Sequence, residues 1–150
     1  MKKKIIIIGK RSFVGLNLFF YLRYRYNVET FDYKKFLSLK ELYISKFDYV
    51  INCSISKSYI TKKYSQKNDL NLAIAKKIEN INTKMIFLST RKVYKNKYNL
   101  KESDSIAPNC NYSKNKLISE NILKKIINKK VLILRISNLI GPYIQNKNKL

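Results

Sequence analysis

Five short segments of the chain are largely apolar, and polar or helically patterned segments separate them. Apolar runs of four or five residues are typical of parallel strands that are buried on both faces of a sheet. The predicted strands span residues 4–8, 28–31, 49–53, 85–88 and 131–134.

Between these segments, apolar residues recur three or four positions apart, which predicts helices. The predicted helices span residues 14–24, 57–79 and 112–127, a short helix or turn spans 36–42, and residues 91–111 form a loop. Strands that alternate with helices predict the α/β class. We therefore expect a Rossmann-like doubly wound parallel sheet of about five strands, with helices on both faces, over residues 1–142. A polar tail follows at 143–150.

Composition narrows the class of protein without naming a function. The 150 residues suffice for one domain, and 45% of them are hydrophobic, as in ordinary globular proteins. The formal net charge is +23, but lysine is spread along the whole chain and is not concentrated in one segment. We therefore do not expect a nucleic-acid partner, although such a field attracts anionic ligands such as dinucleotides and nucleotide sugars.

The N-terminus imitates a secretory signal, because four isoleucines follow three lysines. Gly9 and the two basic residues after it end this apolar run too early for a signal peptide, and no other stretch is long enough to span a membrane. The two cysteines, Cys53 and Cys110, form no metal or disulfide pattern. We therefore expect a cytoplasmic protein with reduced thiols, without a metal site and without membrane contact.

The first predicted strand ends in a glycine turn that opens the first helix. A dinucleotide site needs a tight turn, a close approach of the backbone to the pyrophosphate and a helix N-terminus. Gly9 can form the tight turn, and Gly15 allows close packing of the helix. Ser12 stands where a glycine is expected, and its side chain leaves less room for the pyrophosphate to approach the backbone. Two of the chain's three glycines lie here, which favours a cofactor site over a plain strand–turn–helix joint. The predicted cofactor-binding residues are Gly9, Arg11, Ser12, Phe13, Val14 and Gly15.

Asp32 follows the second predicted strand, where an acidic residue would accept hydrogen bonds from the adenosine ribose. A carboxylate at this position favours NAD. Lys10 and Arg11 favour the phosphorylated cofactor, because a guanidinium binds a 2′-phosphate well. We expect NAD, with NADP as the alternative.

Tyr112 and Lys116 are four residues apart on a predicted helix, so their side chains share one face. An ammonium near a phenol favours the phenolate and lowers the pKa of the phenol. Such a pair, supported by a cationic cofactor and a hydroxyl donor, would transfer protons in alcohol–ketone chemistry. The spacing alone is weak evidence, because the chain has 12 tyrosines and an amphipathic helix with an exposed lysine gives the same pattern.

The order of these motifs resembles the extended short-chain dehydrogenase/reductases, which include NAD-dependent nucleotide-sugar epimerases, dehydratases and reductases. Residues 48–54 are similar to the family's strand that passes under the cofactor, and residues 88–94 to the strand that carries a catalytic serine or threonine. Residues 112–120 look like the helix of the dTDP-4-dehydrorhamnose reductases. Residues 134–142 look like the Arg-x-x-Asn-x-x-Gly-Pro segment that leads into the substrate lobe.

The resemblance implies roles for individual residues. Tyr112 would exchange a proton with a sugar hydroxyl or ketone, Lys116 would bind the nicotinamide ribose and lower the tyrosine pKa, and Thr90 would hydrogen-bond the reacting oxygen. The other implied contacts are those of Cys53 and Ser54 with the cofactor and of Asn138 with the nucleotide sugar.

The resemblance also implies a strand order of 3-2-1-4-5 and a homodimer formed through helices near residues 60–80 and 112–128. The chain departs from the family pattern at Ser12, Lys95 and Ser113, where glycine is frequent, and it ends where family members continue into a substrate-binding lobe. Two alternatives to an active enzyme therefore stay open: an inactive NAD(P)-binding module and a nucleic-acid-binding protein. The identity of the sugar and the choice between epimerisation, dehydration and reduction also stay open.

Overall fold

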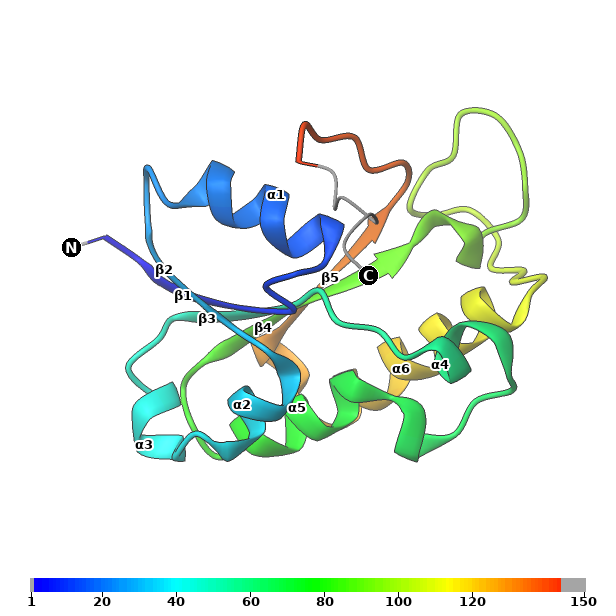
Figure 1. Ribbon diagram of the computed structural model, residues 1–150. Helices are drawn as coiled ribbons and strands as arrows, with labels where there is room; N and C mark the ends of the chain where they lie inside the picture. Colours follow the sequence, from blue (N-terminus) through cyan, green and yellow to red (C-terminus); the bar gives the residue numbers. More distant parts are fainter. Residues whose placement is uncertain (1, 144–150) are drawn as a thin grey trace, which may run out of the picture.

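The computed structural model describes residues 2–143, which contain one parallel sheet of five strands (Figure 1). The predicted tail therefore lies, from residue 144 on, outside the described residues. All five predicted strands are confirmed to within two residues at either end. They are β1 (Lys4–Ile8), β2 (Asn27–Phe31), β3 (Tyr49–Asn52), β4 (Lys84–Thr90) and β5 (Val131–Ile136).

The strand order is β2-β1-β3-β4-β5, so the expected order of 3-2-1-4-5 is wrong. The third strand pairs with β1, with Tyr49 opposite Ile5, and not with β2. The reason lies in the connection between β2 and β3, which forms two short helices, α2 (Tyr33–Ser38) and α3 (Glu41–Ile44), and returns the chain to the other side of β1. The order therefore reverses between β1 and β3, and open α/β sheets bind ligands beside such a reversal, at the carboxyl ends of the strands.

The longer helices are α1 (Phe13–Leu22), α5 (Leu70–Ile78) and α6 (Asn111–Ile127), with one short helix, α4 (Lys57–Thr61), before α5. The single helix predicted over residues 57–79 is therefore wrong. A new helix begins after Asp69, because its side chain caps α5 by accepting from the backbone N–H of Asn71. Between α4 and α5 the chain forms only a short 3₁₀ turn at Gln66–Asn68.

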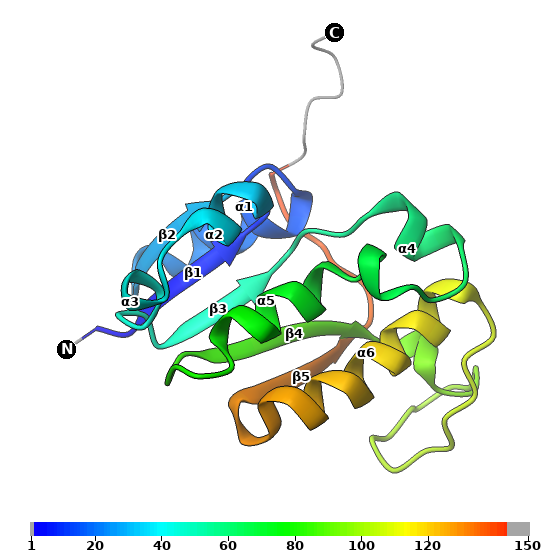
Figure 2. The ribbon, with the colours of Figure 1, turned by 90° about the horizontal axis from the view of Figure 1, so that it is seen from below.

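The two faces of the sheet are covered differently. Helices α2, α3, α5 and α6 pack on one face, whereas α1 packs on the other (Figure 1). Figure 2, seen from below, shows α5 and α6 lying side by side across the sheet. We refer to these as the four-helix face and the α1 face. Helices thus lie on both faces, as predicted.

The main core lies under the four-helix face, because alternate residues of the strands point to it. Its buried members include Ile6, Ile8, Val50, Met85, Phe87, Ile74, Ile78, Leu123 and Ile127. On the α1 face, Ile5, Ile7 and Ile51 are buried under α1. Leu132 and Leu134 of β5 point to the α1 face beyond the reach of α1, and they are 56% and 39% exposed.

Candidate active site

The turn after β1 is built around Gly9. Its φ of +93° lies in the region that favours glycine, and its N–H donates to the carbonyl of Phe31 at 2.8 Å. A Cβ at this position would lie 2.7 Å from the Ser54 hydroxyl and 3.0 Å from the backbone of Cys53. The turn and the loop after β3 are therefore in direct contact, so the structure brings the predicted residues Gly9, Cys53 and Ser54 together.

Ser12 closes the turn. Its hydroxyl donates to the carbonyl of Gly9 at 2.8 Å and accepts from the N–H of Gly15 at 3.0 Å, which makes it the N-cap of α1. A Cβ on Gly15 would lie 2.3 Å from the Gly9 carbonyl oxygen, so this helix position also requires glycine. Phe13 and Val14 stand in the first turn of α1, whose N–H groups have no intrahelical acceptor and suit an anion.

Asp32 lies beside the two basic residues of the turn. Its carboxylate is 3.4 Å from the ammonium of Lys10 and 3.7 Å from Nε of Arg11. The side chains are between 42% and 80% exposed, so these pairs add little to stability. They place one negative and two positive charges at the end of β2, where the ribose of a dinucleotide bound across the turn would reach.

The loop after β3 is held by Asn52. Its amide donates to the Ser54 carbonyl at 3.1 Å, and its side-chain oxygen accepts from the Ser54 N–H at 2.9 Å. Burial raises the pKa of Cys53 to about 12, although the nearby Lys116 opposes the shift. The Cys53 thiol therefore stays protonated at neutral pH, and the loop offers backbone groups and one hydroxyl to a ligand.

Lys116 lies in α6 and points to the carboxyl end of β4. Its ammonium donates to the carbonyl of Leu88 at 2.7 Å and lies 4.7 Å from the centre of the Phe87 ring. The Tyr112 ring centre is 5.8 Å from the same ammonium. The phenol and the amine thus share one face of α6 beside the end of the sheet, as the spacing predicts. An exposed lysine on an outer helix face does not describe this residue, which is 7% exposed.

The protonation of this pair differs from the expectation. Burial lowers the pKa of Lys116 to about 8, although Asp69, Glu120 and Cys53 oppose the shift. Burial also raises the pKa of Tyr112, and Cys110 adds to that increase. The loss of solvent therefore sets the upward direction of the Tyr112 pKa, and the lowering effect expected of Lys116 stays a prediction.

Thr90 and Ser89 end β4 and point to opposite faces of the sheet. Ser89 donates to Glu120 of α6, whereas the Thr90 hydroxyl accepts from the N–H of Lys92 at 3.3 Å. Both are buried. Asn138 lies in an exposed stretch after β5, and within residues 2–143 it makes no hydrogen bond to the tyrosine, the lysine or the threonine.

A buried polar network beside Lys116 was not predicted from the sequence. Asp69 accepts from Ser119 at 2.6 Å and from Tyr64 at 3.1 Å, and the Tyr59 hydroxyl lies 2.6 Å from that of Ser119. Asn71 joins Asp69 to Asn52. The only sequence signal was an acidic residue before an apolar helical stretch, which is typical of an N-cap.

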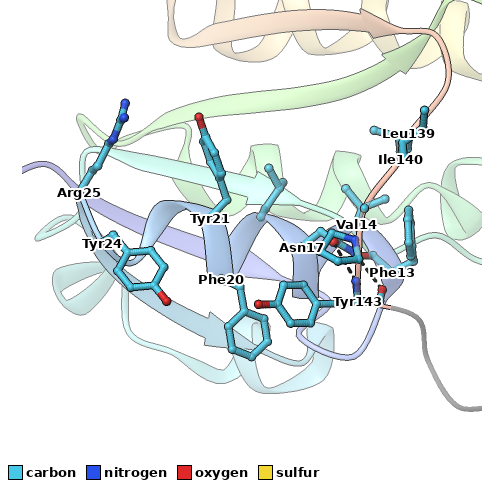
Figure 3. A pocket seen from close by; sticks show the side chains of 13 residues that line it. Phe13, Val14, Asn17, Phe20, Tyr21, Tyr24, Arg25, Leu139, Ile140 and Tyr143 are labelled. Carbon is cyan, nitrogen blue, oxygen red and sulfur yellow. Dashed lines mark hydrogen bonds between the residues drawn. The ribbon is translucent and has the colours of Figure 1, made fainter.

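Asn17 of α1 was also missed. Its side-chain amide donates to the carbonyl of Tyr143 at 3.0 Å, and its oxygen accepts from the Tyr143 N–H at 3.3 Å. The Tyr143 ring stacks on Phe20 at 4.2 Å (Figure 3). The segment after β5 is thereby fastened to α1, and a mainly apolar cavity of about 610 Å³ lies between them. A lone asparagine in a helix carries no sequence signal for such a contact.

The described residues restrict the class of site further. Within residues 2–143 there is no cluster of three side chains able to hold a metal ion. In the same range, no helix is both long enough and apolar enough to cross a membrane. The glycine turn, the acid at the end of β2 and the reversal of strand order beside them define a dinucleotide-binding α/β domain of the Rossmann type.

Comparison with known proteins identifies the family. The model of the NAD dependent epimerase/dehydratase family matches residues 5–150, so the chain belongs to this family. A search of curated proteins finds no match.

Solved structures share the fold. A dTDP-4-dehydrorhamnose reductase from Yersinia enterocolitica superposes with a TM-score of 0.73 at 21% identity, over 99% of this chain and 57% of that one. The reductase from Clostridium acetobutylicum gives 0.70 at 24% identity, over 95% of this chain and 56% of the other. A dTDP-glucose 4,6-dehydratase from Bacillus anthracis, in complex with NAD, gives 0.72 at 20% identity, over 94% and 56%. The chain therefore spans slightly more than half the length of these enzymes.

Proposed function

We propose that this chain is the cofactor-binding part of an NAD-dependent epimerase, dehydratase or reductase that acts on a nucleotide sugar in the cytoplasm, in nucleotide-sugar or surface-polysaccharide metabolism. The observation that carries the proposal is the position of Lys116, buried at the carboxyl end of β4 with the Tyr112 ring beside it. Family membership and the fold shared with nucleotide-sugar enzymes support it.

In the proposed mechanism, Tyr112 transfers the proton. Its phenolate takes the proton of a sugar hydroxyl while the hydride leaves the same carbon, and the phenol returns the proton when a ketone is reduced. Thr90 would donate a hydrogen bond to the reacting oxygen. NAD, when bound, supplies the hydride acceptor. Asn138 would contact the nucleotide sugar.

The burial of both side chains supports a further role for Lys116 in this step. Because burial raises the pKa of Tyr112, the phenol needs a nearby positive charge to ionise near neutral pH. Lys116, with a pKa of about 8, is mainly protonated at pH 7 and can provide that charge. We therefore assign Lys116 both the ribose contact and the electrostatic support of Tyr112.

We test the assignment with Tyr112→Phe. Turnover of a panel of nucleotide sugars with NAD should fall at least about a hundredfold, because general acid–base catalysis contributes on the order of 10²–10⁴. Dinucleotide binding should change little. Tyr98→Phe is the matched control, since Tyr98 is 96% exposed and should leave turnover unchanged. Unchanged turnover in Tyr112→Phe removes that residue from its role.

NAD is the proposed cofactor, and NADP is the alternative. Asp32 would accept from the ribose hydroxyls, whereas Lys10 and Arg11, which lie beside it, would favour a 2′-phosphate once they are released from the carboxylate. Titration calorimetry with NADH and NADPH decides between them, and tighter NADPH binding overturns the preference. Asp32→Asn should shift the ratio of the two affinities toward NADPH by about tenfold, which corresponds to about 1.4 kcal/mol.

An NAD(P)-binding module without catalytic activity is the second candidate. It is favoured by the uncovered part of the α1 face, where Leu132 and Leu134 are partly exposed. This candidate predicts dinucleotide binding without turnover of any nucleotide sugar. Detectable turnover that Tyr112→Phe abolishes rejects it.

We also propose a homodimer through the helices around residues 60–80 and 112–128. Ile60 after the start of α4 and Ile118 of α6 are apolar and partly exposed, which supports this surface. Sedimentation equilibrium should give a dimer for the parent chain and a monomer for Ile118→Lys. A monomeric parent at micromolar concentration rejects the proposal.

A further inference from the structure

Asp69 is a buried carboxylate that carries no ion pair within residues 2–143. One oxygen accepts from the backbone and side-chain N–H groups of Asn71 at 3.0 and 3.1 Å. The other accepts from Ser119 at 2.6 Å and from Tyr64 at 3.1 Å. Four hydrogen-bond donors therefore converge on this one side chain.

Lys116 is a buried cation on α6, the helix that packs against α5. It too is in no ion pair within the described residues, and its hydrogen-bond partner is the carbonyl of Leu88. Ser119, which donates to Asp69, follows Lys116 by three residues on the same face of α6. Tyr59 contacts Lys116 and Ser119, since its ring centre is 5.7 Å from the ammonium and its hydroxyl is 2.6 Å from that of Ser119.

The same network continues to the cofactor side. Asn71 accepts from the amide of Asn52 at 2.8 Å, and Asn52 holds the Ser54 backbone. Ser54 in turn packs against Gly9. A chain of buried and part-buried contacts therefore joins the helix of the tyrosine–lysine pair to the phosphate turn, with Asp69 as its charged member.

We propose that Asp69 is a positioning residue of the Tyr112–Lys116 site. Its carboxylate holds α6 through Ser119 and keeps the neighbouring Lys116 ammonium charged without touching it. The proposal rests on the proposed function, because it gives Asp69 a role at the site assigned there to Tyr112 and Lys116.

The other titratable groups around Lys116 are either paired with another residue or neutral. Glu120, on the same helix, is paired with Arg135 at 2.6 Å and accepts from Ser89. The Cys53 thiol is held neutral by burial. Tyr112 and Tyr59 have pKa values raised by burial and are neutral near pH 7. Of these acids, Asp69 is therefore the one without an ion pair within residues 2–143, and it is the first of the groups that oppose the burial shift of Lys116.

The test measures the titration of Lys116 itself. Competitive acetylation with acetic anhydride, read by mass spectrometry of the peptide that contains Lys116, follows the loss of the proton from this amine as the pH rises. The parent midpoint should lie near pH 8. Asp69→Asn keeps the size of the side chain but removes the charge, so the midpoint should fall by roughly one unit and labelling at pH 7 should rise about fivefold.

Asp48→Asn is the matched control. Asp48 lies directly before β3, at the amino ends of the strands, whereas Lys116 lies at their carboxyl ends. Asp48 pairs with Lys3, so its replacement should leave the Lys116 midpoint unchanged. Circular dichroism shows whether each variant is folded. Should Asp69→Asn fail to fold, Ser119→Ala replaces it, because it removes the hydrogen bond that holds the carboxylate near α6 and should move the midpoint in the same direction by less.

An unchanged midpoint in a folded Asp69→Asn or Ser119→Ala protein overturns the proposal. The labelling needs neither cofactor nor substrate, so its outcome is separate from that of the proposed function. If the midpoint shifts but the chain shows no turnover, the effect of Asp69 on Lys116 is supported and the enzymatic function is rejected. If the midpoint does not shift but Tyr112→Phe abolishes turnover, the proposed function is supported and the role of Asp69 is rejected.

Discussion

The two faces of the sheet differ in how well they are packed and in the site residues that they present. The four-helix face buries the main core and presents Tyr112 and Lys116 from α6. The α1 face buries a smaller cluster, leaves Leu132 and Leu134 partly exposed, and presents the glycine turn at the start of α1. The groups assigned to proton transfer therefore stand on the better packed side, and the groups assigned to the phosphates stand on the less covered side.

This difference has a physical reason. A phosphate turn works through backbone N–H groups at a helix end, so it needs one strand, one turn and one helix. A buried amine needs packing on all sides, because a cation out of water is stable only where neighbours hold it. Lys116 has the rings of Phe87, Tyr59 and Tyr112 around it. Coverage by α6 and α4 supplies that packing.

Matched leucine deletions should give the largest difference between the faces. Leu123 of α6 is 1% exposed in the main core, whereas Leu134 of β5 is on the open part of the α1 face. Leu123→Ala should lower the free energy of unfolding by about 3 kcal/mol, within the range for buried leucines. Leu134→Ala should cost less than about 1 kcal/mol, because little area is taken from water there. Urea unfolding measures both.

Equal losses in the two variants would contradict the comparison. They would mean that the open part of the α1 face is covered in solution, by another copy or by another segment. Sedimentation of the parent at the concentration of the unfolding experiment separates these causes, since a second copy doubles the mass.

Much of this division could be predicted from the sequence, because strands buried on both faces are apolar throughout. The strand positions followed from that pattern, and the shared face of Tyr112 and Lys116 followed from their spacing on a helix. The strand order did not, since residues 32–48 decide it and two four-to-six-residue helices leave no clear periodicity. The Asp69 network could not be predicted from the sequence, because its members come from separate segments and meet only in the folded chain.

The buried amine should give the second largest effect, as a dependence of stability on pH. The pKa of Lys116 is about 8 in the folded chain and about 10.5 in the unfolded one. Between these values the unfolded state binds the extra proton, so the stability of the parent rises with pH. Relative to Lys116→Met, which lacks this group, the free energy of unfolding should rise by about 2 kcal/mol from pH 7 to pH 9.5.

The comparison with Lys116→Met is needed because other buried groups act in the opposite direction. Cys53, with a pKa raised to about 12, loses stability as pH rises above 9, and Tyr59 does so above 10. Both groups are present in the parent and in the variant, so their contributions cancel. Lys124→Met, on the exposed side of α6, should show the same pH dependence as the parent. If the free energy of unfolding changed equally with pH in Lys116→Met and in the parent, the Lys116 amine would be hydrated in the folded chain.

The smallest effect should come from the contact that fastens the chain after β5 to α1. A Cβ on Gly141 would lie 2.2 Å from the side-chain oxygen of Asn17, so Gly141→Ala displaces the amide that holds both backbone groups of Tyr143. The loss should be about 1 kcal/mol, the net value of an exposed pair of hydrogen bonds. Asn17→Ala should reproduce it, and the double variant should cost no more than either change, because both remove one interaction. Additive losses would show that Gly141 and Asn17 act separately, so that Gly141→Ala does not act through the Asn17 amide.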